Sequence, residues 1–219
     1  MIGTPRVHWR RTDSTNERAQ ELAAGGAPHG TLVTASEQTA GRGRQGREWI
    51  APAGSAVLMS VVLRSLHETL PLAAAVAICD ALPVKTAIKW PNDVQVGGLK
   101  LAGILVEGRP QEGWAVLGIG LNVSAAPPEE RATSLGAEGV VASVEEILGG
   151  VVSALERRLD QDADSIVGAW RERDALRGES VRWRDGSGVA AGIDDAGALL
   201  VQTDDGLVTL DAGEVHLLR

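Results

Sequence analysis

The segment from Gly41 to Gly46, Gly-Arg-Gly-Arg-Gln-Gly, restricts the possible folds of this chain more than any other stretch. Its spacing matches the G-x-G-x-x-G fingerprint of dinucleotide-binding folds, which requires a helix directly after the glycine-rich turn. The residues that follow include Pro52 and Gly54, and both oppose a long helix at this position. We therefore reject a Rossmann-type fold and interpret the segment as a loop.

Positive charge is concentrated in this loop, although the chain as a whole carries 29 acidic and 21 basic residues. Glycine lets backbone N–H groups approach an anion closely, and arginine offers a fixed fork of donors to carboxylate or phosphate. Residues Gly41 to Arg47 therefore suit an anion, and Trp49 beside them offers a flat surface to an aromatic ligand. The alternative is a solvated loop whose arginines bind nothing, and the motif alone does not decide between the two.

Composition excludes several classes of protein. The net charge of −8 argues against broad binding to nucleic acid or to a membrane surface, and no apolar run reaches the ~18 residues of a membrane span. The N-terminus lacks the apolar core of a signal peptide, and the single Cys79 cannot form an internal disulfide, which fits a reducing cytoplasm. Phe and Tyr are absent, so the core must consist mainly of Leu, Val, Ile and Ala.

Hydrophobic periodicity and turn residues predict an α+β protein with a mixed β-sheet and flanking helices. The predicted strands are 7–11, 31–36, 55–63, 87–90, 94–96, 99–107 and 115–123. The predicted helices are 14–24, 68–82, 143–159 and 165–176, of which the first and third begin at capping boxes of the form S-x-x-E. The pair Gly97-Gly98 marks a two-residue hairpin turn between two of the strands.

The pattern changes after Gly178. Short β-prone runs then alternate with turns rich in Asp and Gly, which predicts a small β-barrel. These runs are 181–184, 189–193, 199–203 and 207–210. We place a domain boundary near Arg177, which divides the chain into a domain of residues 1–176 and a small C-terminal domain of residues 177–219.

Lys100 is unusual because strict strand alternation places it on one face with Ala102, Ile104 and Val106. Lysine is seldom buried without a partner. One interpretation is that Lys100 stands at the mouth of the strand and extends its ammonium group into water. The other is that its charge is held against a bound anion at the end of an apolar slot.

The strand 115–123 exposes bare backbone on the face that carries Gly118, Gly120 and Asn122. Glycine inside a strand often marks the close approach of a ligand or of another backbone. We interpret this face as the floor of a ligand site, because Asn122 continues it with a polar group. A bulge or tight helix packing is the alternative.

Two further polar stretches have both a structural and a functional interpretation. The run from Lys89 to Asp93 fits an ordinary Pro-Asn-Asp turn, and its carboxylate could also help to position a magnesium ion. Ser14, Thr15 and Asn16 fit the start of a helix, where free N–H groups and short polar side chains also suit a small neutral ligand.

Together these motifs resemble those of the biotin protein ligase family and occur in the family's order and approximate spacing. The matching stretches are Ser14–Asn16, Gln38–Trp49, Lys89–Asp93, Lys100–Gly103 and Gly118–Val123. The resemblance is strong over residues 7–123 and weaker beyond them. It implies a catalytic domain like that of class II synthetases and biotin–lipoate ligases, followed by a small SH3-like β-barrel.

The resemblance implies an ATP-dependent ligase that works in two steps. Biotin and Mg-ATP first form biotinyl-5′-AMP and pyrophosphate. A lysine amine of a biotin carboxyl carrier protein domain then attacks the mixed anhydride and releases AMP. Biotin and ATP are the expected substrates and Mg²⁺ the expected ion, and no protein nucleophile is required.

The resemblance also assigns roles to single residues. Catalytic roles fall to Lys100 and Arg44. The residues expected to bind biotin are Ser14, Thr15, Asn16, Gln38, Gly41, Arg42, Gly43, Arg44, Lys100 and Gly103. The residues expected to bind ATP are Arg42, Arg47, Trp49, Asn92, Asp93, Lys100 and Asn122, with Asp93 as the expected magnesium ligand.

Some members of the family carry an N-terminal helix-turn-helix that represses transcription. Here the catalytic region already begins near Val7, so we expect no DNA binding. We also expect no membrane partner, a cytoplasmic location, and a monomer or homodimer. No site is carried over from residues 213–219, because their register against the family's C-terminal motif is ambiguous by one residue.

Two competing functions stay open. A lipoate–protein ligase shares the fold and the adenylate chemistry, although the Gly-Arg loop and the Lys89–Asp93 run favour biotin. From a different class, the loop with its neighbouring tryptophan could be a single-stranded RNA-binding element, and the net charge of −8 counts against that function.

Overall fold

The computed structural model describes residues 1–65, 69–127 and 131–218. Its main element is a seven-stranded sheet in the order β1-β2-β3-β7-β6-β5-β4. The pair β1–β2 is parallel and the other neighbours are antiparallel, so the sheet is mixed, as predicted. The strands of this sheet are β1 Arg6–Trp9, β2 Leu32–Ala35, β3 Ala56–Leu63, β4 Ala87–Lys89, β5 Asp93–Val96, β6 Leu99–Arg109 and β7 Trp114–Asn122.

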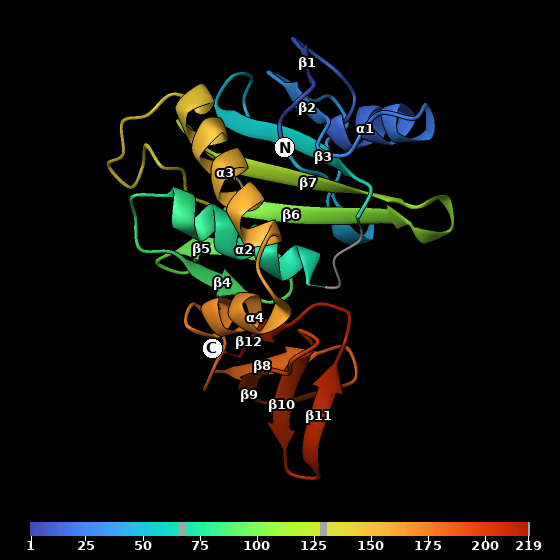
Figure 1. Ribbon diagram of the computed structural model, residues 1–219. Coiled ribbons are helices and arrows are strands. Elements are labelled where there is room, and N and C mark those ends of the chain that lie inside the picture. The colour runs from blue at the N-terminus through green and yellow to red at the C-terminus, as the bar shows by residue number, and fades with distance from the viewer. Residues whose placement is uncertain (66–68, 128–130, 219) are drawn as a thin grey trace.

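Helices cover both faces of this sheet because its central strands are apolar on both sides. The residues of β3 alternate: Val62 packs in the small cluster under α1 (Thr15–Ala24), whereas Val61 belongs to the larger core on the other face. Helices α2 (Leu70–Ala81) and α3 (Val144–Leu159) pack against each other over that larger core (Figure 1). The N-terminal end of α1 therefore lies on the sheet face opposite α2 and α3.

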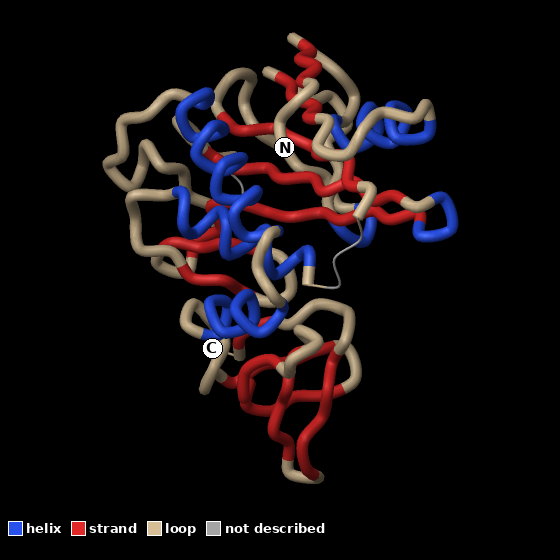
Figure 2. The backbone as a smooth tube through the Cα atoms, viewed as in Figure 1, coloured by secondary structure: helices blue, strands red, loops and turns tan. Residues whose placement is uncertain are grey.

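A second, five-stranded antiparallel sheet follows helix α4 (Ala163–Arg171), in the order β11-β10-β9-β8-β12. Figure 2 shows α4 lying between the two sheets. The strands are β8 Ser180–Trp183, β9 Gly186–Ile193, β10 Leu199–Thr203, β11 Gly206–Leu210 and β12 His216–Leu217. This arrangement confirms the small C-terminal β domain, and the boundary at residues 176/177 stays a prediction.

The loop before β10 joins the two sheets. The Trp90 indole N–H, at the turn between β4 and β5, donates a 3.0 Å hydrogen bond to the carbonyl of Gly197. Gly197 has a φ of +87°, and a Cβ there would press on Leu72 of α2 at 2.8 Å, so glycine is required on both counts. On the other side of the loop, Arg171 of α4 donates to the carbonyl of Ile193 at 2.8 Å.

Two predicted features of secondary structure differ from the structure, and one strand was not predicted. Ser14 stands at the N-cap of α1 but its side chain makes no capping hydrogen bond, so the first predicted capping box is wrong, whereas the one at Ser143 is confirmed. Helix α4 begins after an Asp162 cap and stops at Arg171, earlier than the predicted residue 176. The chain after α4 instead pairs with Ile88 at the free edge of β4. The short strand β12 was not predicted.

The start of the helix predicted at residues 68–82 and part of the loop predicted at 124–132 lie outside the described residues. The hairpin turn at Gly97 and Gly98 is confirmed, since both residues have positive φ, at +57° and +81°. In the part of the chain that the structure describes, no helix is long and apolar enough to cross a membrane.

Candidate active site

A cavity of about 250 Å³ opens on the α1 face of the sheet, between the start of α1, the Gly-Arg loop, β6 and β7. Twelve of the fifteen residues predicted for the site line it. These are Ser14, Thr15, Asn16, Gln38, Arg42, Gly43, Arg44, Arg47, Trp49, Asn92, Lys100 and Gly103. The structure thus gathers segments that are up to about ninety residues apart in sequence.

The floor of the cavity is the bare backbone of β6 and β7, where Gly103 lies opposite Gly120. A Cβ at Gly120 would overlap the Trp49 indole, and a Cβ at Gly118 would overlap the Asn16 amide. At Gly103 a Cβ would come within 3.1 Å of Trp49. The groups that approach Gly118 and Gly120 in the structure are side chains of the protein itself, and the interpretation of this face as the floor of a ligand site stays a prediction.

Lys100 lines the cavity, but on the other face of β6 from the one that strict alternation predicted. Pairing of β6 with β5 shifts at Leu101, which is an extra residue relative to Val94 and Gln95. This bulge brings the Lys100 side chain against Gly103, whose Cβ would lie 3.4 Å from Nζ. The grouping of Lys100 with Ala102, Ile104 and Val106 is therefore wrong.

The Lys100 ammonium group is held inside the cavity rather than extended into water. Its Nζ lies 2.8 Å from Asp93 Oδ1 and 5.7 Å from the centre of the Trp49 ring. The lysine side chain is 27% exposed. An anionic ligand that binds this ammonium group must therefore compete with Asp93.

A chain of hydrogen bonds fixes the polar groups beside the start of α1. Gln38 Oε1 accepts from the Thr15 backbone N–H at 2.6 Å and from the Thr15 hydroxyl at 3.0 Å. The Ser60 hydroxyl of β3, fully buried, lies 2.8 Å from Thr15 Oγ1 and 2.6 Å from Asn16 Oδ1. The Gln38 amide is thereby oriented with its carbonyl toward Thr15, which leaves its NH₂ group free to donate elsewhere.

Four cationic side chains line the cavity, and three of them are paired with carboxylates. Lys100 pairs with Asp93, Arg42 with Glu107 at 2.8 Å, and Arg47 with Glu214 of the C-terminal segment. Arg44 forms no ion pair with any residue that the structure describes, and it donates only a long 3.4 Å hydrogen bond to Asn92 Oδ1.

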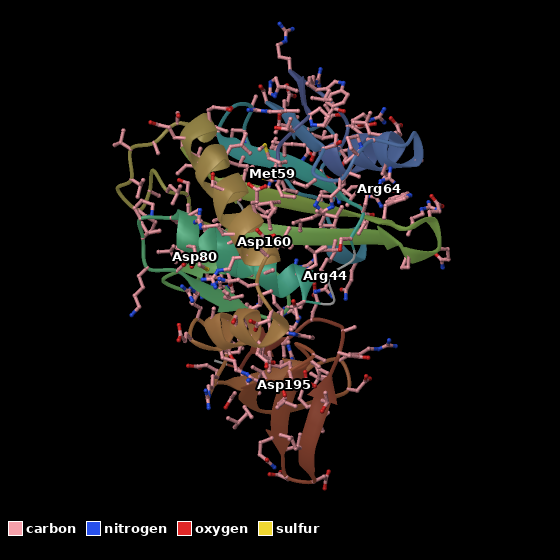
Figure 3. All side chains as sticks on the ribbon, viewed as in Figure 1. Arg44, Met59, Arg64, Asp80, Asp160 and Asp195 are labelled. Carbon is pink, nitrogen blue, oxygen red and sulfur yellow. The ribbon has the colours of Figure 1, made fainter. Side chains whose placement is uncertain are left out.

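Arg44 lies between the main sheet and the C-terminal sheet (Figure 3). Burial lowers the pKa of its guanidinium, and the more distant Glu214 and Asp93 partly offset that effect. The group stays charged at neutral pH because its ordinary pKa is far above 7. Arg44 is therefore a partly desolvated, uncompensated positive charge, which is the property expected of an anion-binding group.

The Gly-Arg loop has an internal hydrogen-bonded structure. Trp49 N–H donates to Gly41 O at 2.9 Å, and Gly43 N–H donates to Arg47 O at 2.7 Å. The short 3₁₀ turn Arg44–Gly46 includes Gln45 with a φ of +56°, an uncommon conformation for a residue other than glycine. The indole of Trp49 anchors the end of the loop on the glycine floor.

Three predicted site residues do not line the cavity. Gly41, at the start of the loop, is buried, and a Cβ there would overlap the carbonyl of Trp49. Asp93 acts through its ion pair with Lys100. Asn122 is buried and donates from Nδ2 to the carbonyl of Thr133 at 3.0 Å, while its Oδ1 has no partner among the described residues.

The carboxylates do not form a metal cage of their own. Within the described ranges, no three His, Cys, Asp or Glu side chains gather closely enough to hold a metal ion. Magnesium often binds through one or two carboxylates with water and substrate phosphates as its other ligands. Asp93 alone therefore fits magnesium only together with a nucleotide.

Two residues that contact the site were missed in the sequence. Ser60 of the apolar strand β3 lies opposite Gly118 of β7. A single polar residue in an otherwise apolar strand was an available signal that Ser60 contacts the site. Glu107 follows Gly103 and Leu105 at alternate positions of β6 and so shares their face. Its contacts with Asn16 and Arg42 span too much sequence for local patterns to indicate them.

Comparison with known proteins agrees with this fold and site. The model of the Biotin/lipoate A/B protein ligase family matches residues 9–124, and the model of the Biotin protein ligase C terminal domain matches residues 178–218. The biotin–[acetyl-CoA-carboxylase] ligase of Mycobacterium tuberculosis is 37% identical, over 96% of this chain and 90% of that protein. The enzyme of the same name from Paracoccus denitrificans is 39% identical, over 94% of this chain and 97% of that protein.

Among solved structures, the biotin protein ligase from Aquifex aeolicus in complex with biotin and ATP superposes with a TM-score of 0.85. It is 28% identical and the match covers 99% of both chains. The match extends over both sheets, since it includes nearly the whole of each protein. This chain belongs to the biotin/lipoate A/B protein ligase family.

Proposed function

We propose that this protein is an ATP-dependent biotin protein ligase. It activates biotin as biotinyl-5′-AMP and transfers the biotinyl group to one lysine of a biotin carboxyl carrier protein domain. The observation that carries this proposal is the cavity itself, which is lined by Lys100 and by Arg44, a cation without an ion-pair partner among the described residues. Such a site suits two anions brought close together.

The chemistry needs that arrangement. In the first step a biotin carboxylate oxygen bonds to the α-phosphorus of ATP, and the bond to pyrophosphate breaks. The carboxylate and the phosphate repel each other, and fixed cations that contact both hold them in reacting geometry and stabilise the charge that develops. Arg44 and Lys100 supply these cations.

In the second step the carrier lysine amine bonds to the biotinyl carbonyl carbon, the bond to AMP breaks, and the amine loses a proton to solvent. This step requires that the carrier lysine amine can reach the mixed anhydride in the cavity and that water cannot hydrolyse it first. The Gly-Arg loop covers the cavity and serves to exclude water until the carrier arrives.

The remaining assignments follow from the resemblance to the family. Ser14, Thr15, Asn16 and Gln38 offer polar groups suited to the ureido ring of biotin, beside the backbone of Gly41 to Gly43. Arg47, Trp49, Asn92 and Asn122 are assigned to the nucleotide. Asp93 would hold magnesium, which would neutralise part of the charge on the phosphates.

The partner we infer is a carrier domain, and we propose that the protein acts in the cytoplasm as a monomer or homodimer. The test is incubation with biotin, Mg-ATP and a biotin carrier domain, followed by intact mass measurement of the carrier. The expected result is one biotinyl group on one lysine. An unchanged carrier under conditions where a known ligase labels it would refute the proposal, and a lipoyl adduct formed with lipoate would identify a lipoate ligase instead.

A further inference from the structure

Glu107 occupies a position that links the floor of the cavity to the loop above it. It lies near the end of β6 on the same face as Gly103, and its side chain is 23% exposed. One carboxylate oxygen accepts from Asn16 Nδ2 at 2.8 Å, and the other lies 2.8 Å from Arg42 Nη2. The two partners come from different parts of the site, α1 and the Gly-Arg loop.

The contact with Asn16 sets the orientation of that amide. An ionised carboxylate only accepts hydrogen bonds, so Asn16 must turn its NH₂ group toward Glu107 and its carbonyl toward Ser60. Ser60 then donates to Asn16 Oδ1 at 2.6 Å. The amide cannot rotate by half a turn without placing its oxygen against the carboxylate. Glu107 therefore fixes which end of the Asn16 amide faces Ser60, at the place where this amide covers Gly118.

The contact with Arg42 fastens the loop. Arg42 is the first arginine of the loop, and its side chain is 43% exposed. Trp49 holds the other end of the loop on Gly120, and Arg42 pairs with Glu48 through a backbone bridge. These backbone contacts tie the two sides of the loop to each other, and the Arg42–Glu107 pair ties the loop to β6, so loss of that pair frees the loop to move away from the floor.

We propose that Glu107 is a positioning residue that anchors the Gly-Arg loop to the floor of the site and retains the biotinyl-adenylate until the acceptor amine arrives. Glu107 does not line the cavity, so it acts through Arg42 and Asn16 rather than by touching the reacting atoms. This inference rests on the proposed ligase function for its consequence in the reaction. Its structural part, the anchoring of the loop, holds for the protein without ligand.

The variant Glu107→Gln keeps the size of the side chain and removes its charge. Its carbonyl can still accept from Asn16, but an NH₂ group then faces the Arg42 guanidinium. We expect release of preformed biotinyl-adenylate into solution to become about tenfold faster, equivalent to about 1.4 kcal/mol. Adenylate formation should change less than release, which a general loss of folding would not produce.

The matched control is Glu112→Gln on the same hairpin. Glu112 pairs with Arg109 and accepts from the Trp114 indole, far from the loop in sequence and outside the cavity lining. It should release adenylate at the wild-type rate. Glu107→Asp keeps the charge on a shorter side chain and should fall between the wild type and Glu107→Gln, and it replaces Glu107→Gln should that variant fail to fold.

A double-mutant cycle separates anchoring from simple packing. If Glu107 acts through Arg42, then the effect of Glu107→Gln on release should largely vanish in an Arg42→Gln background. Additive effects of the two substitutions, or wild-type release by Glu107→Gln, would overturn the inference.

Backbone hydrogen exchange of residues 41–49 without any ligand supplies a readout that does not depend on the ligase activity. Exchange should be faster in Glu107→Gln than in the wild type and unchanged in Glu112→Gln. Equal exchange in all three proteins would overturn the anchoring itself. A wild-type protein that forms no biotinyl-adenylate, with loop exchange that still responds to Glu107→Gln, would refute the proposed function and leave the anchor in place.

Discussion

Arg44 and Lys100 perform different tasks although both are cations of one cavity. Lys100 is neutralised by Asp93 at 2.8 Å, whereas Arg44 forms no ion pair with any described residue. An anion that enters the cavity can bind Arg44 without displacing a carboxylate, and it must compete with Asp93 for Lys100. We therefore infer that Arg44 attracts and retains the anionic ligand, while Lys100 responds to the charge that develops in the reaction.

Replacing Lys100 by alanine should abolish most adenylate formation while the protein stays folded. A preorganised charge contact of this kind contributes about 10²-fold or more to the rate. The measurement is the rate of pyrophosphate release with biotin and ATP, with circular dichroism as the test of folding. The control is Lys85→Ala, an exposed lysine that does not line the cavity. A folded Lys100→Ala protein that reacts at the wild-type rate would show that the lysine takes no part.

Arg44→Gly should keep the fold and release the intermediate early. The side chain makes one long hydrogen bond to Asn92, so its removal disturbs few native contacts. Loss of charge-assisted hydrogen bonds to the adenylate should accelerate its dissociation by about tenfold to a hundredfold. Dissociation is followed with labelled biotin after gel filtration. A dissociation rate equal to that of the wild type would mean that Arg44 does not contact the intermediate.

At the scale of elements, the two central strands β6 and β7 supply both the core of the sheet and the floor of the site. On the α1 face, their glycines admit the Trp49 indole and the Asn16 amide. On the opposite face, their apolar side chains pack under α2 and α3. A single added methyl group on the floor therefore tests whether the close approach is required.

Gly120→Ala should displace Trp49 from the floor. The added Cβ overlaps the indole, so the ring and the end of the loop must move, at a cost of roughly 1–3 kcal/mol in the free energy of unfolding. Urea unfolding and the near-ultraviolet signal of tryptophan report the two effects. Gly108→Ala on β6 is the control, because a Cβ there would meet its nearest atoms at 3.8 and 3.9 Å, an ordinary contact distance. Equal behaviour of the two variants would contradict the packing of Trp49 on this strand.

Local patterns in the sequence were sufficient for most elements of the main sheet. They failed where a long-range contact overrides local preference. The bulge at Leu101 depends on the pairing of β6 with β5, so alternation along one strand gave the wrong face for Lys100. Helix α4 ends early because the following residues pair with Ile88, which no property of the helix itself indicates.

At the scale of the whole molecule, Asp80 at the end of α2 joins three parts of the chain. Its carboxylate accepts from Arg158 of α3 at 2.7 Å and from Arg173 after α4 at 3.0 Å, and it is 20% exposed (Figure 3). Both arginines are also largely covered. This carboxylate helps to fix the segment that leads into the C-terminal sheet.

Asp80→Asn should lower the free energy of unfolding by about 1–3 kcal/mol, because two partly buried guanidinium groups lose their charged acceptor. Asp160→Asn is the matched control, since Asp160 is an exposed aspartate at the end of α3 (Figure 3). Urea unfolding of both variants against the wild type gives the comparison. A loss no greater than that of Asp160→Asn would mean that the arginines are equally well solvated without Asp80.

The predicted site residues lie in short motifs of fixed order, and twelve of these residues line one cavity, while their roles stay predictions. The long-range charged partners of those residues were not predictable. Glu107 and Glu214 pair with Arg42 and Arg47 from segments that local patterns do not bring together. Ion pairs between residues far apart in sequence determine which cations of the cavity have a carboxylate partner, and the structure is needed to identify these pairs.

The most direct test of the central claim is to incubate the wild-type protein with biotin and Mg-ATP in the absence of any carrier. After removal of free ligand, mass spectrometry of the denatured sample should show about one biotinyl-5′-AMP per protein molecule. One pyrophosphate should be released for each adenylate formed. Addition of a carrier domain should then discharge the intermediate as AMP. No bound adenylate from folded protein at saturating biotin and ATP would contradict the account.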